Sequence, residues 1–409
     1  MPLHLLQDTN PIHIDPNGYM TKPKYIIEHG FRRVSPYYHD FSTTVKARWF
    51  KKPIAHVLTT ELGQDSKTIE QGIQDGSIYI STNCNKVDSG IKLSPEETRT
   101  HLFRNHDILH ATQHVHEPPI LYKGPIEVVT ENDDIVAVSK PSGMPTHPSG
   151  AYRWNSLTSI LREEHGYRKL YPCHRLDKAT SGVLLLAKNA ETSSRFQSAF
   201  NDKNNTDKWY LARVKGRFPS EPFVFDHPVF SLSYGGYINI RNTSQVPISS
   251  TGFELVKYSE ELDQSIVRCK AITGKMHQIR IHLRCLGFPI VNDYLYNPPK
   301  ENSKGQFKLQ IEQQLHEMVR SKLKETGEKF VDLDALVNKR PELKEQMAEL
   351  KWLRDTNHDR ELKDVCPECS KILLSDPVNE EIYLHAHRLR HRGDISLDIT
   401  TKMPEWANI

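Results

Sequence analysis

Residues 174–188 read HRLDKATSGVLLLAK, in which a polar and charged stretch leads directly into a continuous apolar run. An apolar run of this length next to turn-forming residues is typical of a buried strand. Asp177 lies between Arg175 and Lys178, and positive neighbours favour the charged form of a carboxylate. A carboxylate at the start of a buried strand can serve as a nucleophile, but it can also form an ordinary ion pair. Taken alone, this stretch favours the ion pair.

A second polar cluster, TGKMHQIRIHL, occupies residues 273–283. If the chain is helical after its glycine, His277 and Arg280 lie one turn apart, while Ile279 and Leu283 face a core. The planar guanidinium of Arg280 can then bind a carboxylate through two parallel hydrogen bonds. An ordinary amphipathic helix explains the same pattern.

A third cluster is KWYLA, in which alternation along a strand places Lys208 and Tyr210 on the same face. A tyrosine in this position can present its phenol to a substrate or simply fill the core, and the core position is the simpler interpretation. Strand-like and helical stretches alternate around the three clusters, which indicates a mixed α+β domain over residues 120–300.

Along the chain the clusters follow one another as HRLDKATSGVLLLAK, KWYLA and TGKMHQIRIHL, and in this order and at these separations they resemble the RluA-type family of pseudouridine synthases. SKPSGMPTHP (139–148) and LGFPIVNDYLY (286–296) are similar to further segments of that family. The resemblance covers residues 120–300, and its longest and most specific pattern surrounds Asp177. Agreement across five segments makes a chance match a poor explanation.

By this resemblance the chain has the pseudouridine synthase fold, an α+β fold with a mixed, mainly antiparallel sheet and flanking helices. Such enzymes break the N1–C1′ bond of an RNA uridine, rotate the base and rejoin it through C5. The resemblance implies that Asp177 is the catalytic nucleophile and that Arg280 pairs with it and keeps it ionised and oriented. Tyr210 would pack on the target base and take part in removing the C5 proton. Whether Asp177 attacks C1′, attacks the base or removes the 2′ proton in a glycal route stays open.

The resemblance also implies a set of substrate-binding residues around a flipped-out base. Arg175 would reach into the RNA and fill the space left by the flipped nucleotide. Ile279 and Leu283 would form the apolar wall of the pocket. Lys275 stands where the family usually has arginine, which keeps the charge but loses the bidentate fork. The expected substrate-binding residues are Arg175, His174, His277, Ile279, Leu283 and Lys275.

The N-terminal part resembles the eukaryotic tRNA-modifying branch of the family, in which a small S4-like α/β module precedes the catalytic domain. Residues 22–52 hold eight lysines or arginines against two acidic residues, interleaved with aromatic residues. Basic groups can bind phosphates and aromatic rings can stack on unpaired bases, although a solvated face explains the composition equally well. We expect five segments: a basic, aromatic N-terminal segment (1–50), an S4-like RNA-binding module (51–115), the catalytic domain (120–300), a charged helical insertion (301–365) and a C-terminal tail that returns to the catalytic domain (366–409).

Charge and composition limit the alternatives. The formal net charge of +3 is only mildly basic, so binding of RNA must depend on local patches. No apolar run approaches the roughly 18 residues of a spanning helix, so we expect no membrane partner. The first residues contain two aspartates and no arginine, which argues against a secretory signal and an ordinary mitochondrial transit peptide. Scattered cysteines indicate a reducing, intracellular setting.

Motifs for common cofactors are absent from the sequence, including the G-x-x-x-x-G-K-[ST] loop, G-x-G-x-x-G and H-E-x-x-H. These absences argue against ATP and dinucleotide sites. The resemblance implies a reaction that needs no cofactor and no metal, which agrees with the missing motifs. Cys366 and Cys369 could hold zinc together with His385 and His387. The single residue between these histidines does not match the usual finger, which argues against it.

The expected function is the isomerisation of specific uridines to pseudouridine in tRNA, in the anticodon stem-loop around positions 31 and 32, by a monomeric enzyme. The alternatives are a synthase that acts on ribosomal or small nuclear RNA, and a non-catalytic RNA-binding protein on a synthase scaffold. Intact Asp177, Tyr210 and Arg280 argue against the non-catalytic alternative. We expect a cytoplasmic protein, and a mitochondrial or nuclear pool stays open.

Overall fold

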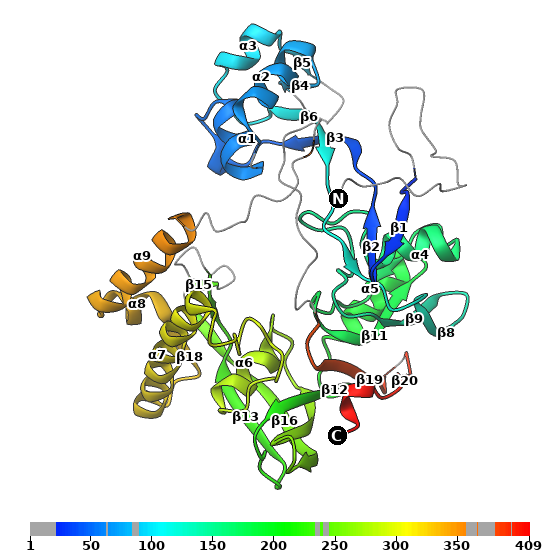
Figure 1. The fold of residues 1–409 in the computed structure, drawn as a ribbon, viewed down its shortest axis with the longest axis vertical. Helices are drawn as coiled ribbons and strands as arrows, with labels where there is room; N and C mark the ends of the chain where they lie inside the picture. Colours follow the sequence, from blue (N-terminus) through cyan, green and yellow to red (C-terminus); the bar gives the residue numbers. More distant parts are fainter. Residues whose placement is uncertain are drawn as a thin grey trace. The chain divides into compact units, whose positions relative to one another are not determined.

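The computed structural model describes residues 22–62, 64–83, 90–233, 238–239, 245–356, 366, 381–393 and 395–409. The chain divides into two compact units (Figure 1). Arg33–Glu117 make up most of the first unit, and Pro118–Glu361 with the C-terminal strands make up most of the second. Within the described ranges, no helix is both long and apolar enough to cross a membrane.

The first unit is a four-stranded antiparallel sheet with three helices, and its strand order is β3-β6-β4-β5. Local capping explains where two of these helices begin. Asp65 accepts hydrogen bonds from the backbone N–H groups of Lys67 and Thr68, and Ser94 forms a capping box with Glu97. The elements are β3 (Tyr37–Thr44), α1 (Ile54–Leu62), α2 (Ser66–Asp75), β4 (Ile78–Thr82), β5 (Ile91–Lys92), α3 (Pro95–Thr100) and β6 (Ile108–Val115).

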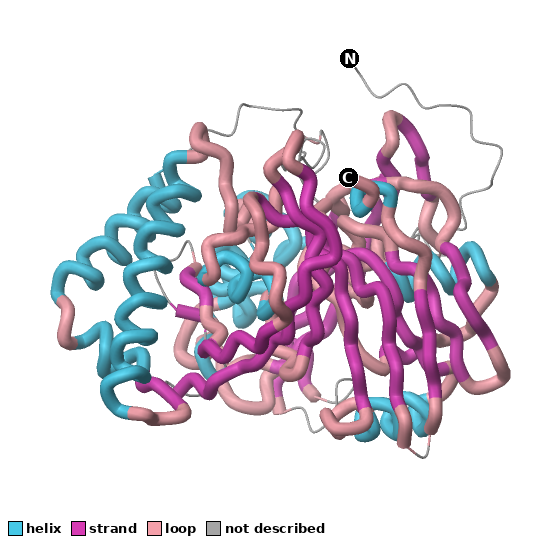
Figure 2. Tube along the Cα trace, turned by 90° about the horizontal axis from the view of Figure 1, so that it is seen from below, coloured by secondary structure: helices cyan, strands magenta, loops and turns pink. Residues whose placement is uncertain are grey.

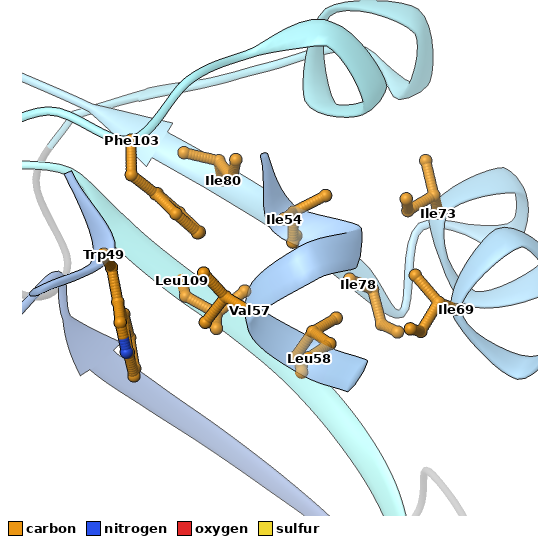
Figure 3. Packing of buried hydrophobic residues seen from close by; sticks show 11 residues of the cluster. Trp49, Ile54, Val57, Leu58, Ile69, Ile73, Ile78, Ile80, Phe103 and Leu109 are labelled. Carbon is orange, nitrogen blue, oxygen red and sulfur yellow. The ribbon is translucent and has the colours of Figure 1, made fainter. Parts of the chain in front are cut away.

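This unit has its own hydrophobic core. Figure 3 shows Trp49 and Phe103 at one side of the cluster and the α2 residues Ile69 and Ile73 at the other. Trp49 is buried in the core, and β3 pairs with β6 along its whole length. The boundary that we expected at residue 50 therefore falls inside a folded unit, because strand pairing and core packing both cross it.

The second unit is built on one large sheet, whose strands run side by side in Figure 2. The main strand order is β13-β16-β17-β12-β19-β11-β9-β8, and among the described strands of this sheet only β11 and β19 pair in parallel. The expected α+β class with a mixed, mainly antiparallel sheet is confirmed. The strands are β8 (Glu127–Glu131), β9 (Ile135–Lys140), β10 (Tyr171–Pro172), β11 (Ser181–Ala187), β12 (Thr206–Lys215), β13 (Phe223–Pro228), β16 (Gln245–Ser259), β17 (Gln264–Ala271), β18 (Phe330–Asp332), β19 (Leu384–His391) and β20 (Leu397–Thr400).

Helices and short strands complete this unit. They are β1 (Tyr25–Glu28), β2 (Phe31–Val34), β7 (Ile120–Leu121), α4 (Leu157–His165), α5 (Ala190–Ala199), β14 (Ser231–Leu232), β15 (Ile238–Asn239), α6 (Gln278–Cys285), α7 (Ser303–Thr326), α8 (Leu333–Asn338) and α9 (Pro341–Thr356). β1 and β2 form a small sheet with β7 at the junction of the two units in the sequence. The helix α6 carries most of the second polar cluster.

The C-terminal strand β19 occupies a central position in the sheet, between β12 and β11. Gly182, at the start of β11, allows β19 to lie directly beside β11. Its φ of +111° is outside the range that L side chains adopt readily, and a Cβ there would meet the backbone oxygen of Ala386 at 2.2 Å. The glycine of the HRLDKATSG stretch therefore allows the backbone of the C-terminal segment to lie against β11.

The charged segment 301–365 is mainly helical over its described residues, with the strand β18 between α7 and α8. Its helices, at the left of Figures 1 and 2, bury a separate core around Ile311, Leu315 and Leu350. The segment is joined to the large sheet, because β18 pairs with the beginning of β16. It is thus an integral part of the second unit.

Buried histidines make the stability of this unit sensitive to acid. Burial lowers the pKa of His282 to about 4, that of His385 to about 4 and that of His174 to about 3. In the unfolded chain these groups take up protons below about pH 6.5, so the stability that neutral histidines contribute is present above that pH and is lost as the pH falls toward 4.

We expect these three histidines alone to remove about 4 kcal/mol of unfolding free energy between about pH 7.5 and about pH 5.5. His227 and His277, whose pKa values are also lowered by burial, add to this loss. Each of the three histidines contributes about 1.4 kcal/mol per pH unit below its unfolded pKa. Urea unfolding followed by far-ultraviolet circular dichroism at the two pH values measures this loss. An unchanged urea midpoint would contradict the burial of neutral histidines.

Candidate active site

Asp177 lies in the loop that leads from β10 into β11. The backbone N–H of Thr180 donates a hydrogen bond to the carbonyl of Asp177 (3.1 Å), which closes a tight turn before the strand. The strand that follows is almost completely buried and pairs with β9 on one side and β19 on the other. The side chain of Asp177 keeps 24% of its surface exposed. A rigid strand therefore holds a partly accessible carboxylate.

Lys140, at the end of β9, supports this loop from inside the protein. Its side chain is buried, and its ammonium donates hydrogen bonds to the carbonyls of Pro141 (2.8 Å), Met144 (2.8 Å) and Lys178 (3.1 Å). Burial lowers the pKa of Lys140 to about 7, while the charge of Asp177 acts in the opposite direction. One buried cation thus connects the end of β9 with the residue that follows Asp177.

Arg280 lies in the first turn of α6 and is 4% exposed. It forms two hydrogen bonds with Asp293, at 2.7 and 2.8 Å, whereas its Nη1 atom lies 3.9 Å from the carboxylate of Asp177. Burial alone would lower the pKa of Arg280, but the hydrogen bonds and charge of Asp293 raise it. Arg280 therefore pairs with two carboxylates: the buried Asp293 takes the bidentate position, and Asp177, the partner that we expected, lies at the longer ion-pair distance.

His277 caps the start of α6 in the left-handed conformation, with φ +57°. Such a backbone conformation is uncommon for a residue other than glycine and is held by its surroundings. Its Nδ1 atom is 2.9 Å from the hydroxyl of Tyr296, and its Nε2 atom is 3.7 Å from the carboxylate of Asp177. Burial, together with the charge of Arg280, lowers the pKa of His277 to about 4. The ring that faces Asp177 is therefore neutral near pH 7.

Tyr210 lies on β12, at an irregularity in the pairing of this strand with β19. It packs against the same hydrophobic cluster as Ile279 and Leu283. Burial raises the pKa of its phenol, and the charge of Asp177 raises it further. The phenol is therefore protonated near pH 7 and close enough to Asp177 to experience its charge.

The other expected substrate-binding residues divide into buried and exposed groups. Ile279 and Leu283 are almost fully buried in the core under α6. The Nε2 atom of His174 accepts a hydrogen bond from the backbone N–H of Leu185 (3.1 Å), so this ring is used inside the protein. Arg175 and Lys275 are exposed on the two loops that carry the polar clusters.

Sequence reasoning did not identify three side chains of this site. Lys140 lies in the SKPSG segment, and Asp293 and Tyr296 lie in the NDYLY segment. Both segments had been recognised as similar to the family, but no single residue in them had been assigned a role. A charged residue next to a strand-like apolar run is the signal that could have pointed to Lys140.

We expect Lys140→Met to lower kcat more than it changes KM. The substitution keeps the apolar stem and removes three donors, so the carbonyl of Lys178 loses a partner beside the nucleophile, and the protein loses about 3 kcal/mol of stability. Steady-state kinetics and urea unfolding measure the two effects. Lys188→Met is the matched control, because Lys188 is only partly buried, with 29% of its side chain exposed, and pairs with Glu131. A kcat equal to that of the control would show that Lys140 does not position the loop.

The zinc arrangement of Cys366 and Cys369 with His385 and His387, which the sequence argued against, has a different partner for His385 in the structure. The two ring nitrogens of His385 lie 2.9 Å from the hydroxyl of Ser181 and 2.8 Å from that of Thr401. Both nitrogens of His385 are therefore hydrogen bonded within the large sheet. Cys366 lies near other histidines, described below, and Cys369 is outside the described residues.

Comparison with known proteins agrees with this geometry. The family model described as RNA pseudouridylate synthase matches residues 134–284, which include Asp177, Tyr210 and Arg280. A Saccharomyces cerevisiae protein named tRNA pseudouridine(31) synthase is 33% identical, over 93% of this chain and 96% of that protein. The human protein named Pseudouridylate synthase RPUSD2 is 30% identical, over 95% of this chain and 76% of that protein.

A further Saccharomyces cerevisiae relative is named tRNA pseudouridine(32) synthase, mitochondrial. It is 28% identical, over 94% of this chain and 79% of that protein. The similarity to these relatives extends over nearly the whole chain. The chain belongs to the RluA-type family of RNA pseudouridine synthases, enzymes that isomerise uridine to pseudouridine in RNA.

Proposed function

We propose that the protein forms pseudouridine in tRNA, in the anticodon stem-loop around positions 31 and 32, with Asp177 as its nucleophile. The observation that carries the mechanism is the placement of the Asp177 carboxylate, which is partly exposed and faces His277 and Arg280 at 3.7 and 3.9 Å. The names of the two yeast relatives, which specify positions 31 and 32 of tRNA, support the choice of substrate.

The reaction is an isomerisation. The N1–C1′ bond of the uridine breaks, a C5–C1′ bond forms, C5 gives up a proton and N1 takes one up. Asp177 attacks C1′, attacks the base or removes the 2′ proton, and in each route its carboxylate must approach the nucleoside closely. The positive charge of Arg280 lies 3.9 Å from this carboxylate, while neutral His277 adds little charge near pH 7.

The exposed cations are suited to hold the RNA. Arg175, two residues before Asp177, reaches into the RNA and fills the space left by the flipped nucleotide. Lys275 lies on the loop before α6 and supplies a point charge for a phosphate. Ile279 lies just below this surface, at 6% exposed, and Leu283 supports it from within the core.

Tyr210→Phe tests the role of the phenol. In the mechanism proposed, the ring packs on the uracil and the hydroxyl takes part in removing the C5 proton. The raised pKa of Tyr210 keeps this hydroxyl protonated near pH 7, so another group must first accept the phenol proton. We expect nearly unchanged tRNA binding and at least a hundredfold lower rate of pseudouridine formation. Release of tritium from 5-tritiated uridine in tRNA measures the step. A wild-type rate would assign the hydroxyl no part in it.

The N-terminal unit is proposed to be the S4-like RNA-binding module. Its compact α/β order and separate core support an independently folded module. Some basic residues of the 22–52 stretch are nevertheless committed to internal contacts. Arg32 is buried and paired with Glu164, and Arg48 pairs with Glu61. Lys67, exposed on α2, and Lys51 are among the cations that remain at the surface.

Pseudouridine mapping of total RNA from cells with and without the protein tests the proposal. We expect loss of pseudouridine at tRNA positions 31 and 32 and its return with the wild-type chain but not with Asp177→Asn. Loss of pseudouridine only at sites in ribosomal or small nuclear RNA would show that these RNAs, and not tRNA, are the substrate. An unchanged map would favour a non-catalytic RNA-binding protein. Separate mapping of cytoplasmic and mitochondrial tRNA shows which pool the enzyme modifies.

A further inference from the structure

Two histidines lie at the end of β6 and directly after it in the first unit. His114 and His116 are two residues apart, so an extended chain directs their side chains to the same face. Their ring centroids are 4.7 Å apart, with an angle of 75° between the ring planes. Rings arranged edge to face at this distance can direct one nitrogen each toward a common point.

Cys366 completes a cluster with these histidines. Its Sγ atom is 3.7 Å from the Nδ1 atom of His114, although the two residues are 252 positions apart in the sequence. One ligand atom from each of His114, His116 and Cys366 lies within 4.8 Å of the other two. Cys366 is only 5% exposed, so its thiol is held inside the unit beside the two rings.

We propose that His114, His116 and Cys366 bind a zinc ion. Thiolate and imidazole are the ligands that zinc prefers in proteins, and two imidazoles with one thiolate match that preference. In a tetrahedral site with Zn–S about 2.3 Å and Zn–N about 2.05 Å, sulfur and nitrogen lie about 3.6 Å apart. The separation of 3.7 Å between Cys366 and His114 agrees with this value. The site lies outside the catalytic centre and replaces our expectation that the protein has no metal.

A neighbour of His114 supports the same interpretation. Tyr38 on β3 is directly opposite His114 in the strand pairing, and their rings stack with centroids 4.7 Å apart and 26° between planes. A metal-binding histidine needs its ring held in one orientation, which packing partners and hydrogen bonds around it provide. The stack supplies this restraint on the side of the ring that faces β3.

Among the described residues, the second unit contains another group of potential ligands, formed by His227, Cys285 and His316. Its geometry is that of a hydrogen bond, because the Nε2 atom of His227 lies 2.8 Å from the Nδ1 atom of His316. Two nitrogens bound to one tetrahedral zinc would be about 3.3 Å apart. This group therefore serves as an internal control for the zinc proposal.

The proposed zinc has a structural role. It joins the end of β6, directly before the chain enters the second unit at Pro118, to a residue from the C-terminal part of the chain. A metal that binds the folded unit and not the unfolded chain stabilises the fold by its binding free energy. Removal of zinc is thus expected to destabilise the first unit.

Metal analysis of the full-length protein, purified without a metal-binding tag, tests the proposal. We expect one zinc ion per chain, reduced to background in Cys366→Ser and in His116→Ala, and retained in the control variants Cys285→Ser and His316→Gln. Zinc that persists in Cys366→Ser, or that is lost only from the control variants, would overturn it. So would a wild-type protein that takes up no stoichiometric zinc when the metal is supplied.

Cobalt substitution of the wild-type protein answers the question without relying on a variant that folds. We expect a thiolate-to-cobalt charge-transfer band and the intense visible bands of a tetrahedral site, and a lower melting temperature after removal of the metal by a chelator. Cobalt bound without the charge-transfer band would exclude Cys366 as a ligand and overturn the assignment. An unchanged melting temperature would contradict the structural role.

Discussion

Asp177→Asn is expected to abolish pseudouridine formation while leaving the fold and tRNA binding intact. The substitution preserves the shape of the side chain and removes its charge, so the loop between β10 and β11 keeps its packing. By analogy with other covalent catalysts, removal of the nucleophile lowers kcat by at least about a thousandfold. Single-turnover assays on tRNA, with binding measured separately, give the two quantities.

Asp133→Asn is a suitable control, because Asp133 is an exposed aspartate of the same unit, in the turn between β8 and β9. We expect it to behave as the wild type in both assays. Residual turnover above about one part in a thousand in Asp177→Asn would be hard to reconcile with a nucleophile. A parallel loss of binding would instead assign Asp177 to substrate recognition.

Asp293→Ala is expected to have the largest effect on stability. The carboxylate of Asp293 is 1% exposed and binds Arg280 through two hydrogen bonds. It also accepts hydrogen bonds from the backbone N–H groups of Leu295 and Tyr296. Removing it leaves a buried guanidinium without its partner, which costs about 3–5 kcal/mol. Urea unfolding measures this loss. Activity should fall as well, because Arg280 then loses its fixed position beside Asp177.

Asp398→Ala provides the matched control. Asp398 forms the same kind of bidentate pair with Arg388, but both side chains are 41% exposed. We expect a loss of at most about 1 kcal/mol, because water solvates both charges when the pair is broken. Equal losses from the two variants would refute the argument from burial. The double variant Asp293→Ala with Arg280→Met should recover part of the stability, since no unpaired buried charge remains.

The elements of the second unit follow closely from local sequence patterns. The VLLLA run predicts the buried strand β11, and the LTSILREEH and AETSSRFQSAF stretches correspond to the helices α4 and α5. The charged segment shows apolar residues at helical spacing, and α7 buries those residues. These predictions succeed because burial of one face imposes a period on the residues of each strand or helix. The position of β19 in the centre of the sheet has no comparable local signal.

The chemistry of the candidate site was only partly predictable. Asp177, Tyr210 and Arg280 come close together as the resemblance implied, and their catalytic roles stay a proposal. The resemblance named Asp177 as a partner of Arg280 but did not name Asp293, because charge patterns do not tell which carboxylates a buried guanidinium will reach most closely. Burial decides between them: Asp293 is shielded from water and makes the stronger pair, whereas Asp177 stays partly solvated.

By itself, the sequence determined the α+β class, the strand that carries Asp177 and the family. These depend on residues that are close together in the chain or on the order of segments that resemble the family. The tertiary structure alone decided three features: the distance between Arg280 and the Asp177 carboxylate, the neutral His277 ring facing Asp177, and the contact of Cys366 with His114, 252 positions away in the sequence. Each depends on distances and burial that arise only when distant segments pack together, because electrostatic and metal–ligand interactions depend on separation in space.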